Sequence, residues 1–287
     1  MHVVTGASGQ LGRRIVTHLR EHVDAGKIIA LSRTPDKLAD LGVQARYGDL
    51  DQPVSLLPHF AGAERVLVIA TDAVGRRTAQ HANAITAAKQ AGVGGFLYTS
   101  MIRAGEPGNA SPILFEHRET ERLLLDSGLP FTLLRNGIYM DMLQLLLPLR
   151  EAAKTGVLPG TLGSGHAAYV TRDDLAAAGA AVLAKGGHDG QILDLTGPQP
   201  LDHAGIAAAL AEATGRPVRH DPTVDEPLES FAARLPAPAR DNPDALRAGE
   251  LFWQSTVEGW ADVFTHHVPR LTGRPSTTLA EFLRTVL

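Results

Sequence analysis

The chain has 287 residues, which is long enough for one large α/β domain with an elaborated C-terminal part or for two modest domains. It contains no cysteine, which excludes disulfides, thiolate catalysis and zinc sites built on cysteine. Its formal net charge is -4 and it has no basic block, so we expect no nucleic-acid partner.

The first twelve residues are typical of a strand, a glycine turn and the start of a helix. An apolar run breaks at Gly6, glycines recur at Gly9 and Gly12, and an amphipathic helical pattern runs from Leu11 to Leu19. This arrangement places backbone N–H groups and a helix N-terminus against a pyrophosphate. Gly6 permits the turn, Gly9 lets the backbone approach phosphates, and Gly12 lets the helix pack close to the strand. We therefore expect a dinucleotide site here.

Apolar runs then alternate with helical patterns through the first half of the chain. Short apolar runs predict buried strands, and helical periodicity predicts the segments between them. The expected strands after the first are 27–31, 43–47, 65–70, 96–100 and 131–135, and the expected helices are 10–22, 34–41, 76–91 and 112–127. This rhythm predicts an α/β fold with a Rossmann-type doubly wound parallel sheet.

The second half of the chain has a different pattern of apolar and polar residues. Strand signals become sparse, with the best at 191–195 and 217–220, and alanine-rich helical patterns dominate. We expect residues 1–135 to form the cofactor-binding Rossmann domain, completed by the strand near 191–195. Residues 136–287 then form a smaller α/β part that is mainly substrate-binding. Within it, 221–250 are rich in proline and acidic residues, which predicts a mobile loop or lid with helical pieces.

The residue after the second expected strand bears on the choice of cofactor. The strand 27–31 ends in Ser32-Arg33, where a dinucleotide fold places the residue that reads the ribose. An Asp or Glu there accepts hydrogen bonds from the 2′-hydroxyl of NAD, whereas a guanidinium suits a 2′-phosphate. Arg33 therefore predicts NADP(H). The alternative is that Arg33 is a solvated loop residue.

The ends of the expected strands predict where the rest of the site lies. In an open α/β sheet, ligands bind at the carboxyl ends of the strands, near the point where the strand order switches. The residues at those ends should therefore form one contiguous site. They are Gly6, Ser32-Arg33, Gly48-Asp49, Ala70-Thr71-Asp72, Thr99-Ser100 and Asn136-Gly137.

Several motifs together resemble one family. They are Gly6-x-x-Gly9-x-x-Gly12, Gln80-His81-x-Asn83, Tyr98-Thr99-Ser100, His117-x-x-x-Glu121, Leu134-Arg135-Asn136-Gly137-x-Tyr139 and Val170-Thr171-Arg172. On these motifs the chain resembles the NmrA-like atypical short-chain dehydrogenases/reductases. Within that group it is most similar to the type-2 NADPH:quinone oxidoreductases and the triphenylmethane reductases. The match covers nearly the whole chain and thins between 221 and 270.

The resemblance implies an NADPH-binding protein that reduces small aromatic acceptors such as quinones. It implies that a backbone turn holds the pyrophosphate, that one arginine meets the 2′-phosphate, and that later strand ends border the adenine, the ribose and the nicotinamide. The implied residues are, in that order, Gly6, Ala7, Ser8, Gly9, Gln10 and Leu11; Arg33; Asp49; Ala70, Thr71 and Asp72; and Asn136, Gly137, Ile138 and Tyr139. The position of Thr99 and Ser100 at the end of a strand makes them further expected cofactor contacts.

The usual catalytic pair of short-chain dehydrogenases is missing. That pair is Tyr-x-x-x-Lys, in which the lysine lowers the pKa of a tyrosine acid. The residues four after the tyrosines are Asp51, Ile102, Leu143 and Asp173, so the pair is absent. A quinone needs little acid help, because its reduced product is a phenolate. We therefore expect direct hydride transfer to a stacked aromatic acceptor, with protons from water or a weak donor.

Two residues are candidate catalytic groups. His117 lies on a predicted helix, and Glu121 one turn later is placed to orient it as a proton donor. The alternative is a surface His–Glu pair on a charged helix face. Tyr139 either packs against the nicotinamide or donates to the substrate, and its alternative is an ordinary half-buried aromatic side chain.

Two other functions compete with the reductase. NmrA-like proteins include non-catalytic sensors that bind the dinucleotide and a partner protein. An isoflavone-reductase-like enzyme is less well matched, because that group carries a lysine where this chain has His117. We further expect a cytoplasmic protein that forms homodimers, with no metal site and no membrane span. Leu143 to Leu149 should be core or dimer contact, Asp173 should cap a helix, and Arg172 should have no site role.

Overall fold

A seven-stranded parallel sheet forms the centre of the molecule. The computed structural model describes residues 1–160, 165–224, 233–235 and 237–287. The strand order is β3-β2-β1-β4-β5-β6-β8, and every neighbouring pair is parallel. The order therefore switches direction between β1 and β4, as in a doubly wound fold. The strands are β1 (His2–Val4), β2 (Ile28–Ser32), β3 (Gln44–Tyr47), β4 (Arg65–Val68), β5 (Phe96–Met101), β6 (Phe131–Asn136) and β8 (Gln191–Leu195).

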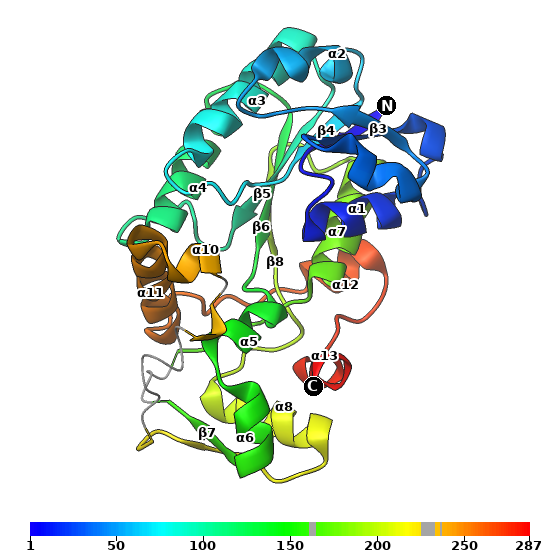
Figure 1. The fold of residues 1–287 in the computed structure, drawn as a ribbon. Coiled ribbons are helices and arrows are strands. Elements are labelled where there is room, and N and C mark those ends of the chain that lie inside the picture. Colours follow the sequence, from blue (N-terminus) through cyan, green and yellow to red (C-terminus); the bar gives the residue numbers. More distant parts are fainter. Residues whose placement is uncertain (161–164, 225–232, 236) are drawn as a thin grey trace.

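Helices cover both faces of this sheet, as Figure 1 shows. One face carries α1 (Gln10–Leu19), α7 (Arg172–Lys185) and α12 (His267–Thr272), and the other carries α2 (Leu57–Phe60), α3 (Arg77–Ala91) and α4 (Pro112–Leu125). Short 3-10 helices at Ala25–Lys27, Pro35–Leu41, Pro53–Ser55 and Met140–Met142 connect other elements. The predicted α/β class and Rossmann-type sheet are confirmed.

Alternating side chains along the strands supply two separate cores. Leu97 of β5 packs with Leu67 and Ile15 on the α1 side, whereas Phe96 and Tyr98 pack on the α3 side. This alternation follows from the period of two in a strand. Because a parallel sheet is buried on both faces, its strands read in the sequence as continuous apolar runs.

The last strand of the sheet comes from the second half of the chain. β8 pairs with β6 in parallel, with Leu133 opposite Ile192 and Asn136 opposite Leu195. The predicted strand at 191–195 therefore exists and extends the sheet. Ahead of it, α7 is almost wholly buried, and its small side chains permit close packing. A Cβ at Gly179 would already contact Leu134 at 3.6 Å.

The remaining elements form a third apolar cluster at the lower end of Figure 1. They include a two-stranded parallel sheet of β7 (Val157–Pro159) and β9 (Arg219–Asp221). The helices there are α5 (Leu143–Leu146), α6 (Leu149–Thr155), α8 (His203–Thr214), α10 (Ala237–Arg240), α11 (Pro243–Val257) and α13 (Leu279–Val286). Leu143, Leu146, Leu147 and Leu149 are buried in this cluster, which confirms the core interpretation of that run.

Three predicted local features differ from the structure or lie partly outside the described residues. The predicted lid at 221–250 falls partly outside the described residues, and its described end is helical in α10 and α11. The strand expected at 217–220 is shifted to β9. The expectation that Asp173 caps α7 is wrong, because the Thr171 hydroxyl accepts from the Asp174 N–H instead. Within the described ranges, no helix is long and apolar enough to cross a membrane.

Candidate active site

The glycine turn after β1 has the geometry of a phosphate cradle. Gly6 has φ +65, a left-handed conformation that favours glycine, and the Gly9 N–H donates to its carbonyl at 3.0 Å. A Cβ at Gly12 would lie 2.8 Å from the Ala7 Cα and still closer to the Gly6 carbonyl oxygen. Helix α1 begins at Gln10 with no side-chain cap, so its first N–H groups stay available to an anion. These residues fit a dinucleotide pyrophosphate.

The end of β2 lies beside this turn. The Ser32 hydroxyl donates to the Ser8 hydroxyl at 2.8 Å and accepts from the Thr34 N–H at 3.0 Å. These bonds tie the β2 end to the glycine turn. Arg33 projects from the same end with an exposed side chain. Its guanidinium is free to meet a charged group that lies over the turn.

Asp49 shapes the loop after β3. Its carboxylate accepts from the Asp51 N–H at 3.0 Å, and its own N–H donates to the Ser55 hydroxyl at 2.9 Å. Asp51 in turn accepts from Gln80 at 3.0 Å and pairs with Arg76 at 2.5 Å, which lowers the pKa of the Asp51 carboxyl. The loop that carries Asp49 is thus tied to the start of α3.

The segment after β4 is held by side chains from neighbouring elements. The Ala70 N–H donates to the Thr99 hydroxyl at 2.8 Å, and the Thr71 hydroxyl donates to the Gln80 side-chain carbonyl at 2.6 Å. The Thr71 N–H also donates to His81 Nε2 at 3.3 Å. Thr99 and Thr71 therefore position the strand end, and Asp72 beyond them is exposed.

Two histidines and a tyrosine form a buried cluster behind this segment. The Tyr98 hydroxyl lies 2.9 Å from His117 Nδ1 and 3.3 Å from His81 Nδ1, and His81 Nδ1 also bonds the Thr120 hydroxyl at 3.0 Å. Burial lowers the pKa of His81 to about 3 and lowers the pKa of His117 well below its ordinary value, and the charge of Arg77 adds to both effects. Burial also raises the pKa of Tyr98. The whole cluster is therefore uncharged near neutral pH.

Glu121 has a different partner from the one predicted. Its two carboxylate oxygens accept from Arg135 Nε at 2.8 Å and Arg135 Nη2 at 2.7 Å, and one of them also accepts from the Ser100 hydroxyl at 2.6 Å. The expectation that Glu121 orients His117 is therefore wrong, because the carboxylate is already saturated by Arg135 and Ser100. The alternative of a surface His–Glu pair is also wrong, since both side chains are buried.

The segment after β6 places Tyr139 at the same edge of the sheet. The Gly137 N–H donates to the Leu195 carbonyl at 2.8 Å, which fixes the turn, and the buried Asn136 side-chain amide donates to the Tyr139 hydroxyl at 3.2 Å. The Arg172 guanidinium lies 4.5 Å from the centre of the Tyr139 ring and pairs with Asp141. Arg172 thus contacts a candidate site residue, and the expectation that it has no site role stays a prediction. Burial raises the pKa of Tyr139.

Arg77 acts electrostatically on several candidate site residues, and the sequence analysis did not single it out. It is the first residue of α3, and its Nε and Nη1 atoms are buried without a hydrogen-bond partner in the described part of the chain. Its charge acts on His81, His117 and Tyr139. An arginine at a helix start carries no sequence signal of its own, because most such side chains point into solvent.

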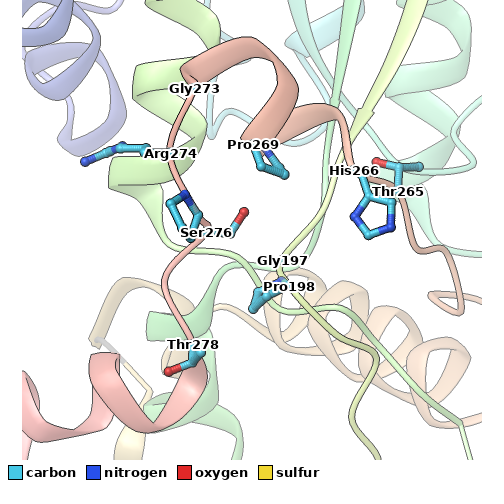
Figure 2. Close-up of a pocket in the computed structure, with 10 residues that line it drawn as sticks. Gly197, Pro198, Thr265, His266, Pro269, Gly273, Arg274, Ser276 and Thr278 are labelled. Carbon is cyan, nitrogen blue, oxygen red and sulfur yellow. The ribbon is translucent and has the colours of Figure 1, made fainter.

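A pocket of about 610 Å³ is lined by none of these residues (Figure 2). It is lined by glycines, prolines and polar side chains that follow β8 and surround α12, among them Gly197, His266 and Ser276. None of its lining residues was predicted as a site residue. A second pocket, of about 470 Å³, lies beside Asp141 and Arg172 and so borders the Tyr139 side of the site. In the described ranges, no cluster of three or more His, Asp or Glu could hold a metal.

A parallel sheet with a glycine turn after β1 and polar residues gathered at the switch between β1 and β4 defines a Rossmann-type dinucleotide-binding protein. Residues 6–186 match the family model described as NAD(P)H-binding. The chain belongs to this NAD(P)H-binding family, which confirms the predicted nicotinamide cofactor.

Several characterised relatives resemble the chain over its whole length. It is 36% identical to quinone oxidoreductase 2 of Escherichia coli over 98% of this chain and 96% of that protein. It is 33% identical to the NAD(P)H azoreductase of Xenophilus azovorans over 99% and 97% of the two chains. The structure of the Citrobacter sp. triphenylmethane reductase complexed with NADP(H) superposes with a TM-score of 0.86, at 32% identity and full coverage of both chains. The predicted family and the oxidoreductase class are confirmed.

Proposed function

We propose that this protein transfers a hydride from NADPH to a quinone or a related conjugated aromatic acceptor. The observation that carries the proposal is the 36% identity, over nearly both whole chains, to a relative named as a quinone oxidoreductase. The azoreductase and the triphenylmethane reductase are further relatives named for conjugated aromatic substrates. The geometry at the carboxyl ends of the strands supports the proposal, because it joins a phosphate cradle to a half-buried aromatic ring.

The dinucleotide would lie across the switch between β1 and β4. The turn from Gly6 to Leu11 would hold the pyrophosphate, Arg33 the 2′-phosphate, and the loop of Asp49 the adenine. Beyond the switch, the strand ends would border the ribose and the nicotinamide; their residues are Ala70, Thr71, Asp72, Thr99, Ser100, Asn136, Gly137 and Ile138. When bound, the reduced nicotinamide supplies the hydride.

The protein would then need to place an acceptor ring and admit a proton. Tyr139 offers a half-buried ring, and its hydroxyl is held by Asn136. The predicted catalytic roles of His117 and Tyr139 stay predictions. Burial keeps His117 neutral and makes Tyr139 a weaker acid, because it lowers the pKa of the first and raises that of the second. We therefore assign the proton to water.

The test is oxidation of NADPH by the purified protein, with and without a simple quinone, followed by the absorbance of the reduced nicotinamide. We expect quinone-dependent oxidation that is slower with NADH. Tight NADPH binding with no turnover of quinones, azo dyes or triphenylmethane dyes would contradict the proposal. That result would favour the dinucleotide sensor, and a partner protein would then be sought.

The predicted preference for NADPH depends on Arg33. Arg33→Ala should lower the ratio of NADPH to NADH affinity by about tenfold or more, since a charge-assisted contact to phosphate is lost. The matched control is Arg20→Ala, which removes another exposed arginine, near the end of α1. Fluorescence titration of both cofactors measures the ratio. An unchanged ratio in Arg33→Ala would refute the assignment of the 2′-phosphate.

A further inference from the structure

Arg77 is half-buried, and part of its guanidinium group is shielded from solvent. Its Nε and Nη1 atoms have no hydrogen-bond partner in the described chain. Buried nitrogens of a charged group that lack a partner cost free energy, and a functional role is one of the reasons for which natural proteins retain them. Arg76, the preceding residue, has an exposed side chain and pairs with Asp51. The two neighbouring arginines thus differ in burial and in partners.

The titratable groups on which the charge of Arg77 acts are themselves uncharged near neutral pH. Its charge acts on His81, Tyr98, His117 and Tyr139, and burial keeps these four side chains uncharged near neutral pH. The nearby acidic side chain is Glu116, which is buried in α4. One of its oxygens accepts from the Gly75 N–H at 2.9 Å, and the other has no hydrogen-bond partner. Among the described residues, Glu116 and Arg77 form no ion pair with each other.

The place of Arg77 along the sheet suggests what it meets. The glycine turn after β1 supplies the pyrophosphate cradle on one side of the switch. Arg77 follows β4, on the other side of the switch, and its charge acts on side chains from β5, α4 and the segment after β6. A dinucleotide bound across the switch extends its nicotinamide half over these strands. Arg77 therefore lies on the side where the acceptor would receive the hydride.

We propose that Arg77 binds the acceptor oxygen that becomes negatively charged during hydride transfer. This inference rests on the proposed function. The acceptor gains two electrons and one hydrogen as a hydride, NADPH is oxidised to NADP⁺, and the charge stays on a phenolate oxygen until water donates a proton. A guanidinium fixed beside that oxygen stabilises the charge as it develops. Arg77 would thus supply the electrostatic help that the missing Tyr-x-x-x-Lys pair gives in other reductases.

Three variants separate this role from others. Arg77→Met removes the charge and keeps most of the side-chain volume, Arg77→Lys keeps a charge, and Arg122→Met is the control on an exposed arginine of α4. The measurements are NADPH affinity, the single-turnover rate of hydride transfer to a quinone, and the affinity of the NADP⁺-loaded protein for a nitrophenolate. Arg77→Gln replaces Arg77→Met if thermal unfolding shows that the Met variant does not fold.

We expect Arg77→Met to lower the hydride-transfer rate by roughly 10²–10³-fold and to weaken nitrophenolate binding at least tenfold, as loss of an oxyanion donor does. NADPH affinity should change less than threefold. Arg77→Lys and added guanidinium ion should each restore part of the rate, and Arg122→Met should leave all three quantities unchanged.

Three results would overturn the inference. A loss of NADPH affinity equal to the loss of rate would place Arg77 on a cofactor phosphate. Restoration of the rate by adding Glu116→Gln to Arg77→Met would show that Arg77 only balances Glu116. An unchanged rate in a folded Arg77→Met protein would exclude any role in the reaction. If the wild-type protein reduces no acceptor, the proposed function fails, but the nitrophenolate titration still tests Arg77 by itself.

Discussion

The two halves of the candidate site differ in the kind of group that forms them and in how deeply those groups are buried. The half over β1, β2 and β3 consists of backbone atoms and exposed side chains, namely the glycine turn and Arg33. The half over β4, β5 and β6 consists of buried side chains that bond one another. A substitution that adds atoms should therefore disturb the close backbone packing of the first half. A substitution that removes atoms should leave buried bonding partners unpaired in the second half. Substitutions in one half or the other therefore test this contrast.

The largest effect is expected from removing Glu121 in the second half. Glu121→Ala leaves Arg135, which is mostly buried, without its carboxylate, and breaking such a pair costs about 3–5 kcal/mol. Urea unfolding measures the change in the free energy of unfolding. The control is Arg122→Ala, whose pairs with Glu119 and Asp126 lie at the surface, and it should cost about 0–1 kcal/mol. Equal costs for the two variants would contradict the contrast.

Adding one methyl group to the first half should have the next largest effect. In Gly12→Ala, the new Cβ would collide with backbone atoms of Gly6 and Ala7, which cannot move aside without opening the turn. We expect a loss of about 1–3 kcal/mol in the free energy of unfolding and a large loss of NADPH affinity. Gly26→Ala is the control, because a Cβ there meets no atom within 4 Å. Normal NADPH binding by Gly12→Ala would show that the turn does not hold the dinucleotide.

The smallest effect concerns acid sensitivity in the second half. Unfolded histidines titrate near pH 6.5, whereas burial lowers the pKa of His81 and His117 in the native protein. As the pH falls below about 6.5, these two histidines become protonated in the unfolded chain but stay neutral in the native protein. The free energy of unfolding should therefore fall by about 1.4 kcal/mol per pH unit for each histidine, as far as about pH 3 for His81.

Denaturant unfolding between about pH 6.5 and 5 measures this slope. His117→Gln should make the slope shallower than in the wild-type protein, even if the substitution lowers the stability at every pH. His22→Gln, which replaces an exposed histidine, should leave the slope as it is. Parallel slopes for His117→Gln and the wild-type protein would mean that His117 is protonated in the native state.

The features that could be predicted are those that leave a local pattern. Buried parallel strands give apolar runs, and the glycine turn needs glycine at fixed spacing. The strands of the sheet and the turn from Gly6 to Gly12 could therefore be predicted from the sequence. Even β8, which lies far along the chain from β6, was readable from its own apolar residues.

The features that could not be predicted depend on which side chains meet. His81, Tyr98 and His117 come from α3, β5 and α4, and their contact follows from how the two helices pack on the sheet. The sequence analysis paired Glu121 with His117, one helical turn away. In the structure, Arg135 of β6 donates two N–H groups to the Glu121 carboxylate and is its partner instead. Arg77 was missed because only the packing shows that two of its side-chain nitrogens are buried without a partner in the described chain.

The late arrival of β8 has a consequence for how the protein is made. β6 ends at Asn136, but its outer neighbour begins only at Gln191. While the ribosome is extending the chain through the intervening residues, β6 presents a free edge of backbone N–H and C=O groups. Such edges pair readily with other chains. We therefore expect the growing polypeptide to be most prone to aggregation, and most dependent on chaperones, until residue 195 has emerged.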